Sequence, residues 1–235
     1  MSAYLPLATL LRSDAARPRV TCYDDVEGPT RGERIELSAR VLGNWVSKAA
    51  NALQDDWDAE PGTVVRIAAE PHWRPLYWAL AAWSVGACVA LDDGPCDVLV
   101  TDDPALLDGR PGGGILLTRA SLARAATVPV PEGAMDEAKE LSTHPDQFAA
   151  WAEPEDDDPA FRTDDGTQTW GGSPAGPAVA PGARILLDDP DLETLLRAAL
   201  AAWGVDGSIV LGAGPLAPEA VAARAATEGA VLLAD

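Results

Sequence analysis

Residues 61–95 read PGTVVRIAAEPHWRPLYWALAAWSVGACVALDDGP, and the chain contains this stretch twice. Shifted by 120 positions and without a gap, residues 181–215 read PGARILLDDPDLETLLRAALAAWGVDGSIVLGAGP. The Pro-Gly pair at 61–62, the run ALAAW at 79–83 and the Gly-Pro pair at 94–95 all recur in the second copy. A repeat at this wide spacing predicts two subdomains that share one supersecondary unit, not a solenoid.

Each copy predicts a strand, a helix and a second strand. Short apolar runs at Val64–Ala69 and Ile185–Leu187 are typical of strands that are buried on both faces. Segments rich in Ala and Leu follow them, and Gly86 and Gly204 end these segments as helices. A strand–helix–strand unit with short turns gives parallel pairing. The expected fold class is α/β, with two pseudo-repeated subdomains of mostly parallel sheets flanked by helices.

The rest of the chain supplies further elements around the repeat. We expect an opening helix at 5–16, a hairpin at 19–35, a helix at 38–53, a strand at 97–101 and a short helix at 121–126. One or two short helices are expected at 134–152, then a helix at 218–228 and a strand at 230–233. The acidic run at 153–158 is typical of a solvated loop. We place the subdomain boundary there, giving a first subdomain at 1–155 and a smaller second one at 156–235.

The strongly negative net charge argues against nucleic acid and anionic membranes as binding partners. The net charge is −20, and Lys48 and Lys139 are the two lysines of the chain. Nucleic acid and anionic membranes are therefore not expected as partners, because their phosphates need a basic face. No apolar run reaches the length of a membrane span, and the first residues lack the basic start of a signal peptide, so we expect a cytoplasmic protein. The spacing of the three cysteines predicts neither a disulfide framework nor a metal site.

The first hundred residues resemble the N-terminal part of the adenylate-forming, or AMP-binding, acyl-CoA-synthetase-like enzymes. The resemblance rests on Glu33–Ser38, Ala50–Leu53, Pro61–Val65 and Ala81–Ala87. The chain is also similar to a small family of short proteins that are distant relatives of those synthetases and have no assigned activity. Segments shared with that small family are Tyr23–Asp25, Asn44–Val46 and Pro71–Trp73. The resemblance implies two subdomains of similar topology, each a sheet flanked by helices.

The region that matches the phosphate loop of those enzymes departs from their pattern. The family binds ATP phosphates with a loop rich in Ser, Thr and Gly that ends in Pro-Lys-Gly, whereas residues 163–174 here read TDDGTQTWGGSP, without a lysine. Asp164 and Asp165 stand where phosphate would approach, and like charges repel at short range. The sequence also shows no counterpart of the family's later nucleotide motifs or of its small C-terminal domain. Residues that would bind a nucleotide in this degenerate loop are Asp165, Gly166, Thr167, Gln168 and Thr169. A surface hairpin or loop is the structural alternative for this segment, and the residues favour it.

Two further segments are candidate sites. Gly212, Gly214 and Asp235 mimic a dinucleotide fingerprint, because the glycines follow a strand, open a helix and precede an acidic residue after the next strand. The repeat explains the same segment structurally, since Gly94-Pro95 occupies the equivalent position. His72, Trp73 and Arg74 follow a strand at the edge where parallel sheets bind ligands, so they are candidates for a pocket rim. A turn packed by two aromatic rings is the structural alternative. No catalytic triad and no metal-ligand spacing is visible.

These patterns leave three hypotheses open. The first is a non-enzymatic binding or partner protein with a degenerate phosphate loop, and this is the reading that the residues favour. The second is a module that binds a nucleotide, with ATP or AMP as its ligand, or acyl-CoA in the cleft of an AMP-dependent synthetase. The third is dinucleotide binding through Gly212–Ala217. The sequence identifies neither the small-molecule ligand nor the physiological partner, and it leaves open whether the chain forms a homodimer.

Overall fold

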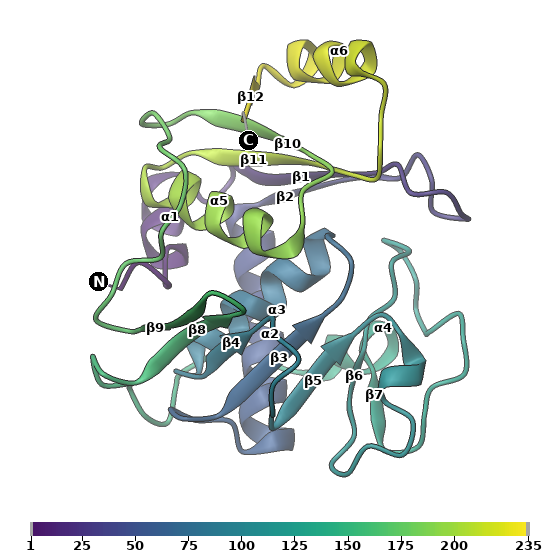
Figure 1. Ribbon diagram of the computed structural model, residues 1–235, viewed down its shortest axis with the longest axis vertical. Coiled ribbons are helices and arrows are strands. Elements are labelled where there is room, and N and C mark those ends of the chain that lie inside the picture. The colour runs from purple at the N-terminus through teal and green to yellow at the C-terminus, as the bar shows by residue number, and fades with distance from the viewer. Residues whose placement is uncertain (1, 234–235) are drawn as a thin grey trace. The chain divides into compact units, whose positions relative to one another are not determined.

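The computed structural model describes residues 2–233, which form two compact units. The first unit comprises the residues up to Leu5, Asn44–Glu70 and Arg74–Pro174. The second comprises Pro6–Gly43, Pro71–Trp73 and the residues from Ala175 onward. Each unit takes residues from both sides of the boundary expected near residue 155, and the second unit combines elements from the two ends of the colour bar (Figure 1).

The first unit contains a seven-stranded sheet in the order β7-β6-β5-β3-β4-β8-β9. Its strands are β3 (Val64–Ala68), β4 (Cys88–Ala90), β5 (Val98–Thr101), β6 (Gly114–Leu116), β7 (Ala134–Asp136), β8 (Pro159–Thr163) and β9 (Gly166–Thr169). All neighbouring strands are parallel except β8 and β9, which form an antiparallel hairpin. Strands β4-β3-β5-β6-β7 follow the 2-1-3-4-5 order of doubly wound α/β sheets. The associated helices are α2 (Ala39–Trp57), α3 (Trp73–Ser84), α4 (Glu137–Glu140) and the 3₁₀ turns η1 (Pro104–Leu106) and η2 (Leu141–Thr143).

The second unit contains a five-stranded sheet in the order β12-β10-β11-β1-β2. Its strands are β1 (Pro18–Asp24), β2 (Arg34–Ser38), β10 (Arg184–Asp188), β11 (Ser208–Ala213) and β12 (Val231–Leu232). Its helices are α1 (Leu7–Asp14), α5 (Leu192–Gly204) and α6 (Pro218–Glu228). Helices α5 and α6 cover opposite faces of this sheet (Figure 1). Strands β12, β10, β11 and β1 run parallel, and β2 returns antiparallel to β1.

The internal repeat is confirmed down to its strand register. Val64 lies opposite Cys88 between β3 and β4, and Arg184 lies opposite Ser208 between β10 and β11, so both pairings keep the 120-residue offset. The strands that lie beside the two copies of the repeat, β8 in the first unit and β1 in the second, are also alike. Each begins with a proline, has a register shift at its first residues, and pairs with the next strand in an antiparallel hairpin, β8 with β9 and β1 with β2. The α/β fold class and the mostly parallel sheets are therefore as expected.

One local expectation is wrong. Residues 121–126 form turns and not a helix, because six residues are too few to nucleate a helix without a packed face, and Leu122 is 88% exposed. The short helices expected within 134–152 are present as α4 and η2. The surface hairpin, which was the structural alternative to a phosphate loop, is present as β8 and β9.

A charged cluster ties α6 to the sheet of the second unit. Arg184 Nη2 lies 2.6 Å from Glu228 Oε2, Arg34 Nη2 lies 3.0 Å from Glu228 Oε1, and the Tyr23 hydroxyl donates to Glu228 as well. Burial alone would raise the pKa of Glu228, but hydrogen bonds from Tyr23, Arg184 and Arg34 outweigh it and lower this pKa from 4.5 to about 2. Ionised Glu228 therefore stabilises the folded chain.

This cluster predicts a specific loss of stability in acid. A carboxyl whose pKa is lowered on folding contributes stability above its unfolded pKa of 4.5, and the contribution is lost as the pH falls toward about 2. We expect Glu228→Gln to be less stable than the wild type at pH 7 and to lose less additional stability in acid. Urea unfolding at pH 7, 4 and 3 measures this, with Glu219→Gln on the exposed side of α6 as the control. Equal acid sensitivity of Glu228→Gln and wild type would contradict the assignment.

Candidate functional site

The topology of the second unit identifies one edge of its sheet as the place for a ligand. Strands β11-β10-β12 have the spatial order 2-1-3, because the chain leaves β10 for β11 through α5 and then crosses back past β10 to β12 through α6. In open α/β sheets, ligands bind outside the carboxyl ends of the strands where the strand order reverses. For this unit that position is the carboxyl edge between β10 and β12.

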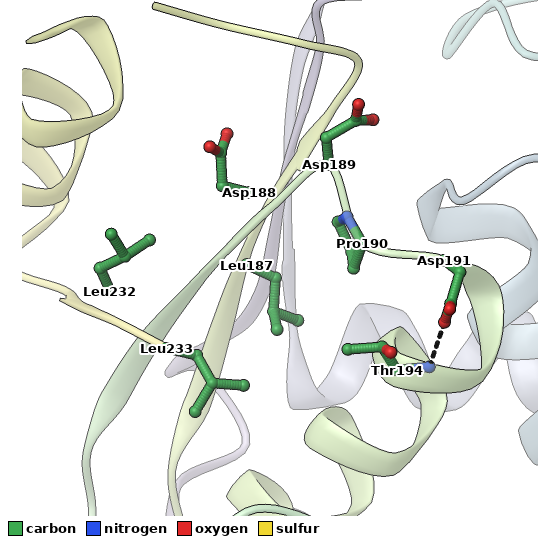
Figure 2. Close-up of a pocket in the computed structure, with 8 residues that line it drawn as sticks. All are labelled: Leu187, Asp188, Asp189, Pro190, Asp191, Thr194, Leu232 and Leu233. Atoms are coloured by element: carbon green, nitrogen blue, oxygen red, sulfur yellow. Dashed lines mark hydrogen bonds between the residues drawn. The ribbon is translucent and has the colours of Figure 1, made fainter. Parts of the chain in front are cut away.

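A hollow of about 530 Å³ lies at this edge (Figure 2). It is lined by Leu187, Asp188, Asp189, Pro190, Asp191, Thr194, Leu232 and Leu233. The lining comes from the end of β10, the loop into α5, the first turn of α5 and the end of β12. The site therefore combines aliphatic side chains with three carboxylates from neighbouring positions in the chain.

The loop between β10 and α5 is held by hydrogen bonds of its own aspartates. Asp191 is the N-cap of α5, and its Oδ1 accepts from the Thr194 backbone N–H at 2.7 Å. Asp189 adopts a positive φ of 46°, and its Oδ1 accepts from the Gly214 backbone N–H at 2.8 Å. The N–H of Asp189 in turn donates to the Gly212 carbonyl at 2.8 Å. The carboxylates of Asp189 and Asp191 are therefore held in place by the loop after β11 and by the first turn of α5.

The charges at the hollow decide which ligands it favours. Its lining residues carry three carboxylates and no cationic side chain. A phosphate brought to this place meets like charges, whereas an ammonium group gains from them. Within residues 2–233, no group of three His, Cys, Asp or Glu side chains is arranged to hold a metal ion. The chemistry of the lining favours a ligand that is cationic or neutral and carries an apolar part.

The predicted phosphate-loop residues lie in the β8–β9 hairpin of the first unit. Thr163 pairs with Gly166, so Asp164 and Asp165 alone form the tip. Both aspartates, Gly166, Thr167 and Thr169 are exposed and Gln168 is half-buried. Gln168 Oε1 accepts from the Tyr4 hydroxyl at 3.2 Å. The predicted residues thus occupy the hairpin tip, with Asp165, and the edge strand β9, with Gly166–Thr169, and their role in nucleotide binding stays a prediction.

The predicted dinucleotide segment borders the hollow of the second unit. Gly214 has a φ of +101°, and a Cβ at this position would lie 2.6 Å from the backbone nitrogen of Val26. The glycine is thus required by the close approach of residues 25–26, which occupy the space next to it. Gly212 lies in β11, and a Cβ there would lie 2.8 Å from Arg224 Nη1. Asp235 lies outside the described residues.

The predicted pocket-rim residues are buried. His72, Trp73 and Arg74 are 4%, 2% and 3% exposed. The rings of His72 and Trp73 lie 5.7 Å apart. Arg74 belongs to the first unit, where its Nη1 lies 2.7 and 2.9 Å from the two carboxylate oxygens of Glu137 and its Nη2 donates to the Ala120 carbonyl at 3.0 Å. A role of these three residues in ligand binding stays a prediction.

Sequence reasoning missed the hollow at β10 and β12. The signal was present in the run Asp188-Asp189-Pro190-Asp191, which follows a buried strand and precedes a helix. The run indicates a ligand site only once the strand order is known. The carboxyl end of β10 is a ligand position because β11 lies on one side of β10 and β12 on the other. That pairing was not visible from the sequence, since β12 has two residues.

Comparison with known proteins places the fold. No protein-family model matches the chain. A curated Mycobacterium tuberculosis protein, designated TIGR03089 family protein, is 36% identical over 150 residues, which cover 60% of this chain and 60% of that protein. The match thus spans less than two thirds of the curated relative. Among residues 2–233, no helix combines the length and the apolar character needed to cross a membrane.

Three solved structures illustrate the likeness in fold. The N-terminal domain of FACL13 from Mycobacterium tuberculosis superposes with a TM-score of 0.67 at 13% identity, covering 98% of this chain and 61% of that one. The Brucella canis acyl-CoA synthetase superposes with a TM-score of 0.69 at 15% identity, covering 99% of this chain and 47% of that one. The fused adenylation–PCP protein NpsA-ThdA from Klebsiella oxytoca superposes with a TM-score of 0.65 at 15% identity, covering 98% of this chain and 42% of that one. The expected resemblance is confirmed at the level of the fold: the chain is folded like the N-terminal domains of acyl-CoA synthetases and adenylation enzymes.

Proposed function

We propose that this chain is a binding protein built on the N-terminal fold of adenylate-forming enzymes, and that it does not activate carboxylates with ATP. The observation that carries the proposal is the β8–β9 hairpin, which stands where the resemblance puts the phosphate loop. Its tip consists of Asp164 and Asp165, and strand pairing continues up to Thr163 and Gly166. A phosphate loop needs open backbone N–H groups and a cation, and this tip offers two carboxylates instead.

The hollow at the carboxyl ends of β10 and β12 supports the binding half of the proposal. It lies where open α/β sheets bind ligands, and Leu187, Leu232 and Leu233 supply an apolar wall. Asp188, Asp189 and Asp191 supply negative charge beside that wall. We therefore expect an amine with a hydrocarbon part to fit better than a nucleotide or a coenzyme A thioester, whose phosphates these carboxylates repel.

A thermal-shift panel followed by calorimetry tests this function. The panel holds Mg-ATP, AMP, NAD, CoA and an acyl-CoA on one side, and spermidine, phenethylamine and octylamine on the other. A ligand at one hundred times its Kd stabilises the folded state by about 2.7 kcal/mol, so a binder is visible as a shift of a few degrees. We expect shifts with an amine and none with the phosphates.

One pair of variants makes the test specific for the hollow. Asp191→Asn removes a charge from the hollow but keeps a good N-cap for α5, so it should weaken amine binding several-fold without loss of stability. Asp164→Asn makes the same change at the exposed hairpin tip of the first unit and should leave binding unchanged. Stabilisation by Mg-ATP or AMP, with no response to amines, would overturn the proposal in favour of a nucleotide-binding module.

A further inference from the structure

The hollow at β10 and β12 reaches both faces of the sheet in the second unit. Leu186 of β10 packs with Val221 of α6, and side chains alternate between the two faces along a strand. Leu187 is therefore directed to the face that α5 covers, and Asp188 to the face that α6 covers (Figure 1). Because Leu187 and Asp188 both line the hollow, the hollow continues around the carboxyl end of β10.

The carboxylates of the hollow are divided between the same two faces. Asp191 is the N-cap of α5 and belongs to the α5 side, whereas Asp188 belongs to the α6 side. Figure 2 shows these two side chains on opposite sides of Pro190, with their carboxylates pointing in different directions. Aliphatic side chains accompany them along the lining, namely Leu187, Leu232 and Leu233. The lining thus presents a carboxylate, an aliphatic surface and a second carboxylate around the end of one strand.

The α6 side of this edge already holds a cation of the chain itself. Arg224 of α6 donates from Nη1 and Nη2 to the two carboxylate oxygens of Asp25 at 2.6 and 2.9 Å, and its guanidinium lies 4.1 Å from the centre of the Tyr23 ring. A Cβ on Gly212, the register partner of Asp188, would lie 2.8 Å from Arg224 Nη1. Hydrogen bonds to Asp25 raise the pKa of Arg224, burial opposes them, and the nearby charge of Asp188 adds to the rise. The carboxyl ends of these strands therefore stabilise a cation beside Asp188.

The guanidinium of Arg224 leaves the hollow with a surplus of negative charge. Asp25 is its bidentate partner and balances it. The residues that line the hollow add the carboxylates of Asp188, Asp189 and Asp191, and none of these lining residues is cationic. One ammonium group offsets one of these charges, and a second ammonium group on the same ligand offsets another. The charge of the hollow therefore favours a ligand with more than one cationic group.

We propose that the ligand is an aliphatic diamine or polyamine that spans the end of β10, with one ammonium group at Asp191 on the α5 side and another at Asp188 on the α6 side; this inference rests on the amine-binding function proposed above. The methylene groups between the two ammonium groups contact the aliphatic lining. Since both aspartates are exposed, the second contact adds about fivefold in affinity, the upper range for an ion pair in contact with solvent. Asp188 is then the residue that distinguishes a diamine from a monoamine.

Calorimetry with two amines of equal length tests the site at both ends. Putrescine carries an ammonium group at each end of its methylene chain, and in aminobutanol a hydroxyl group replaces one of them, so the two ligands differ by one charge. We expect putrescine to bind the purified chain at least about fivefold more tightly than aminobutanol, whereas two identical ends give about twofold by statistics alone. Added salt should reduce this advantage, because the contacts are exposed.

Three variants locate the second ammonium group. Asp188→Asn and Asp191→Asn should each lower the ratio of the two affinities to about twofold. Glu219→Gln removes a charge from the exposed side of α6 and should leave the ratio unchanged. The ratio is measured within one variant, so it is independent of the fraction of that variant that is folded.

The outcomes separate this inference from the proposed function. A wild-type ratio of about two or less, a ratio that Asp188→Asn does not lower, or binding of octylamine without putrescine overturns the two-ended site and leaves the amine-binding function standing. Absence of binding by every amine overturns that function as well.

Discussion

Replacing Arg74 with methionine lowers the free energy of unfolding by about 3–5 kcal/mol, the range for removing one partner of a buried ion pair. Arg74 and Glu137 are 3% and 0% exposed as side chains, and the guanidinium contacts both carboxylate oxygens. The Tyr77 hydroxyl donates to the same carboxylate. Without Arg74, a carboxylate that is fully buried loses the charge that compensates it, which is why the loss is large.

The effect of Arg74→Met should shrink as the pH falls. Burial raises the pKa of Glu137 above its usual value, although Arg74 and Tyr77 act to lower it. In Arg74→Met the lowering by Arg74 is lost, so the pKa of Glu137 rises further. A carboxyl whose pKa is raised on folding takes up a proton more readily in the folded state, so falling pH favours the folded variant. Urea unfolding at pH 7.5 and 5.5 measures both effects. Arg31→Met breaks an exposed pair with Glu27 and should cost less than about 1 kcal/mol. A similarly small cost for Arg74→Met would contradict the role of the buried pair.

Truncation of either repeated tryptophan to alanine lowers the free energy of unfolding by about 3–5 kcal/mol. Trp83 and Trp203 occupy equivalent positions of the repeat and are each 1% exposed. Trp83 Nε1 donates to the Ala160 carbonyl of β8 at 2.8 Å, and Trp203 Nε1 donates to the Arg19 carbonyl of β1 at 3.2 Å. Each indole therefore fills the core between a helix and a sheet and also satisfies a carbonyl of the strand beside the repeat.

The equivalent roles predict equivalent responses to milder changes. Phenylalanine at either position keeps most of the ring volume but leaves a buried carbonyl without its donor, at a cost of about 1–3 kcal/mol. Trp151→Ala, at a side chain that is 61% exposed, should change stability by less than about 0.5 kcal/mol. Urea unfolding followed by circular dichroism gives all five values. A large effect at one repeat position with a negligible effect at the other would show that the two tryptophans are not structural equivalents.

Sequence reasoning predicted the parts of the fold that the repeat covers. Strands and helices at 61–95 and 181–215 were visible because buried parallel strands are continuous apolar runs and because the second copy confirmed the first. Strands β7 and β8 were missed because three to five residues carry too little periodicity to be recognised, although a surface hairpin at residues 166–169 was an alternative that the sequence favoured. The interleaved units were also invisible, since β1 joins β11 across most of the chain and no local pattern encodes that pairing.

The candidate site was predictable only in part. Residues around Gly166 were identified through the resemblance, and their lack of lysine pointed away from phosphate chemistry. The hollow at β10 and β12 depends on a strand order that brings residues 187–191 next to residues 232–233.

The most direct test of the central claim is ATP–pyrophosphate exchange with the purified chain, Mg²⁺ and a panel of acetate, medium-chain and long-chain fatty acids, aryl acids and amino acids. Adenylation is reversible and incorporates labelled pyrophosphate into ATP, so even slow activation of a carboxylate is detected. If the proposed binding function is right, exchange stays at the protein-free background for every acid, because the tip of the β8–β9 hairpin offers the carboxylates of Asp164 and Asp165 and no cation to ATP. Exchange that depends on one carboxylate and rises with protein concentration would contradict the proposed binding function and would show that the chain is an adenylate-forming enzyme.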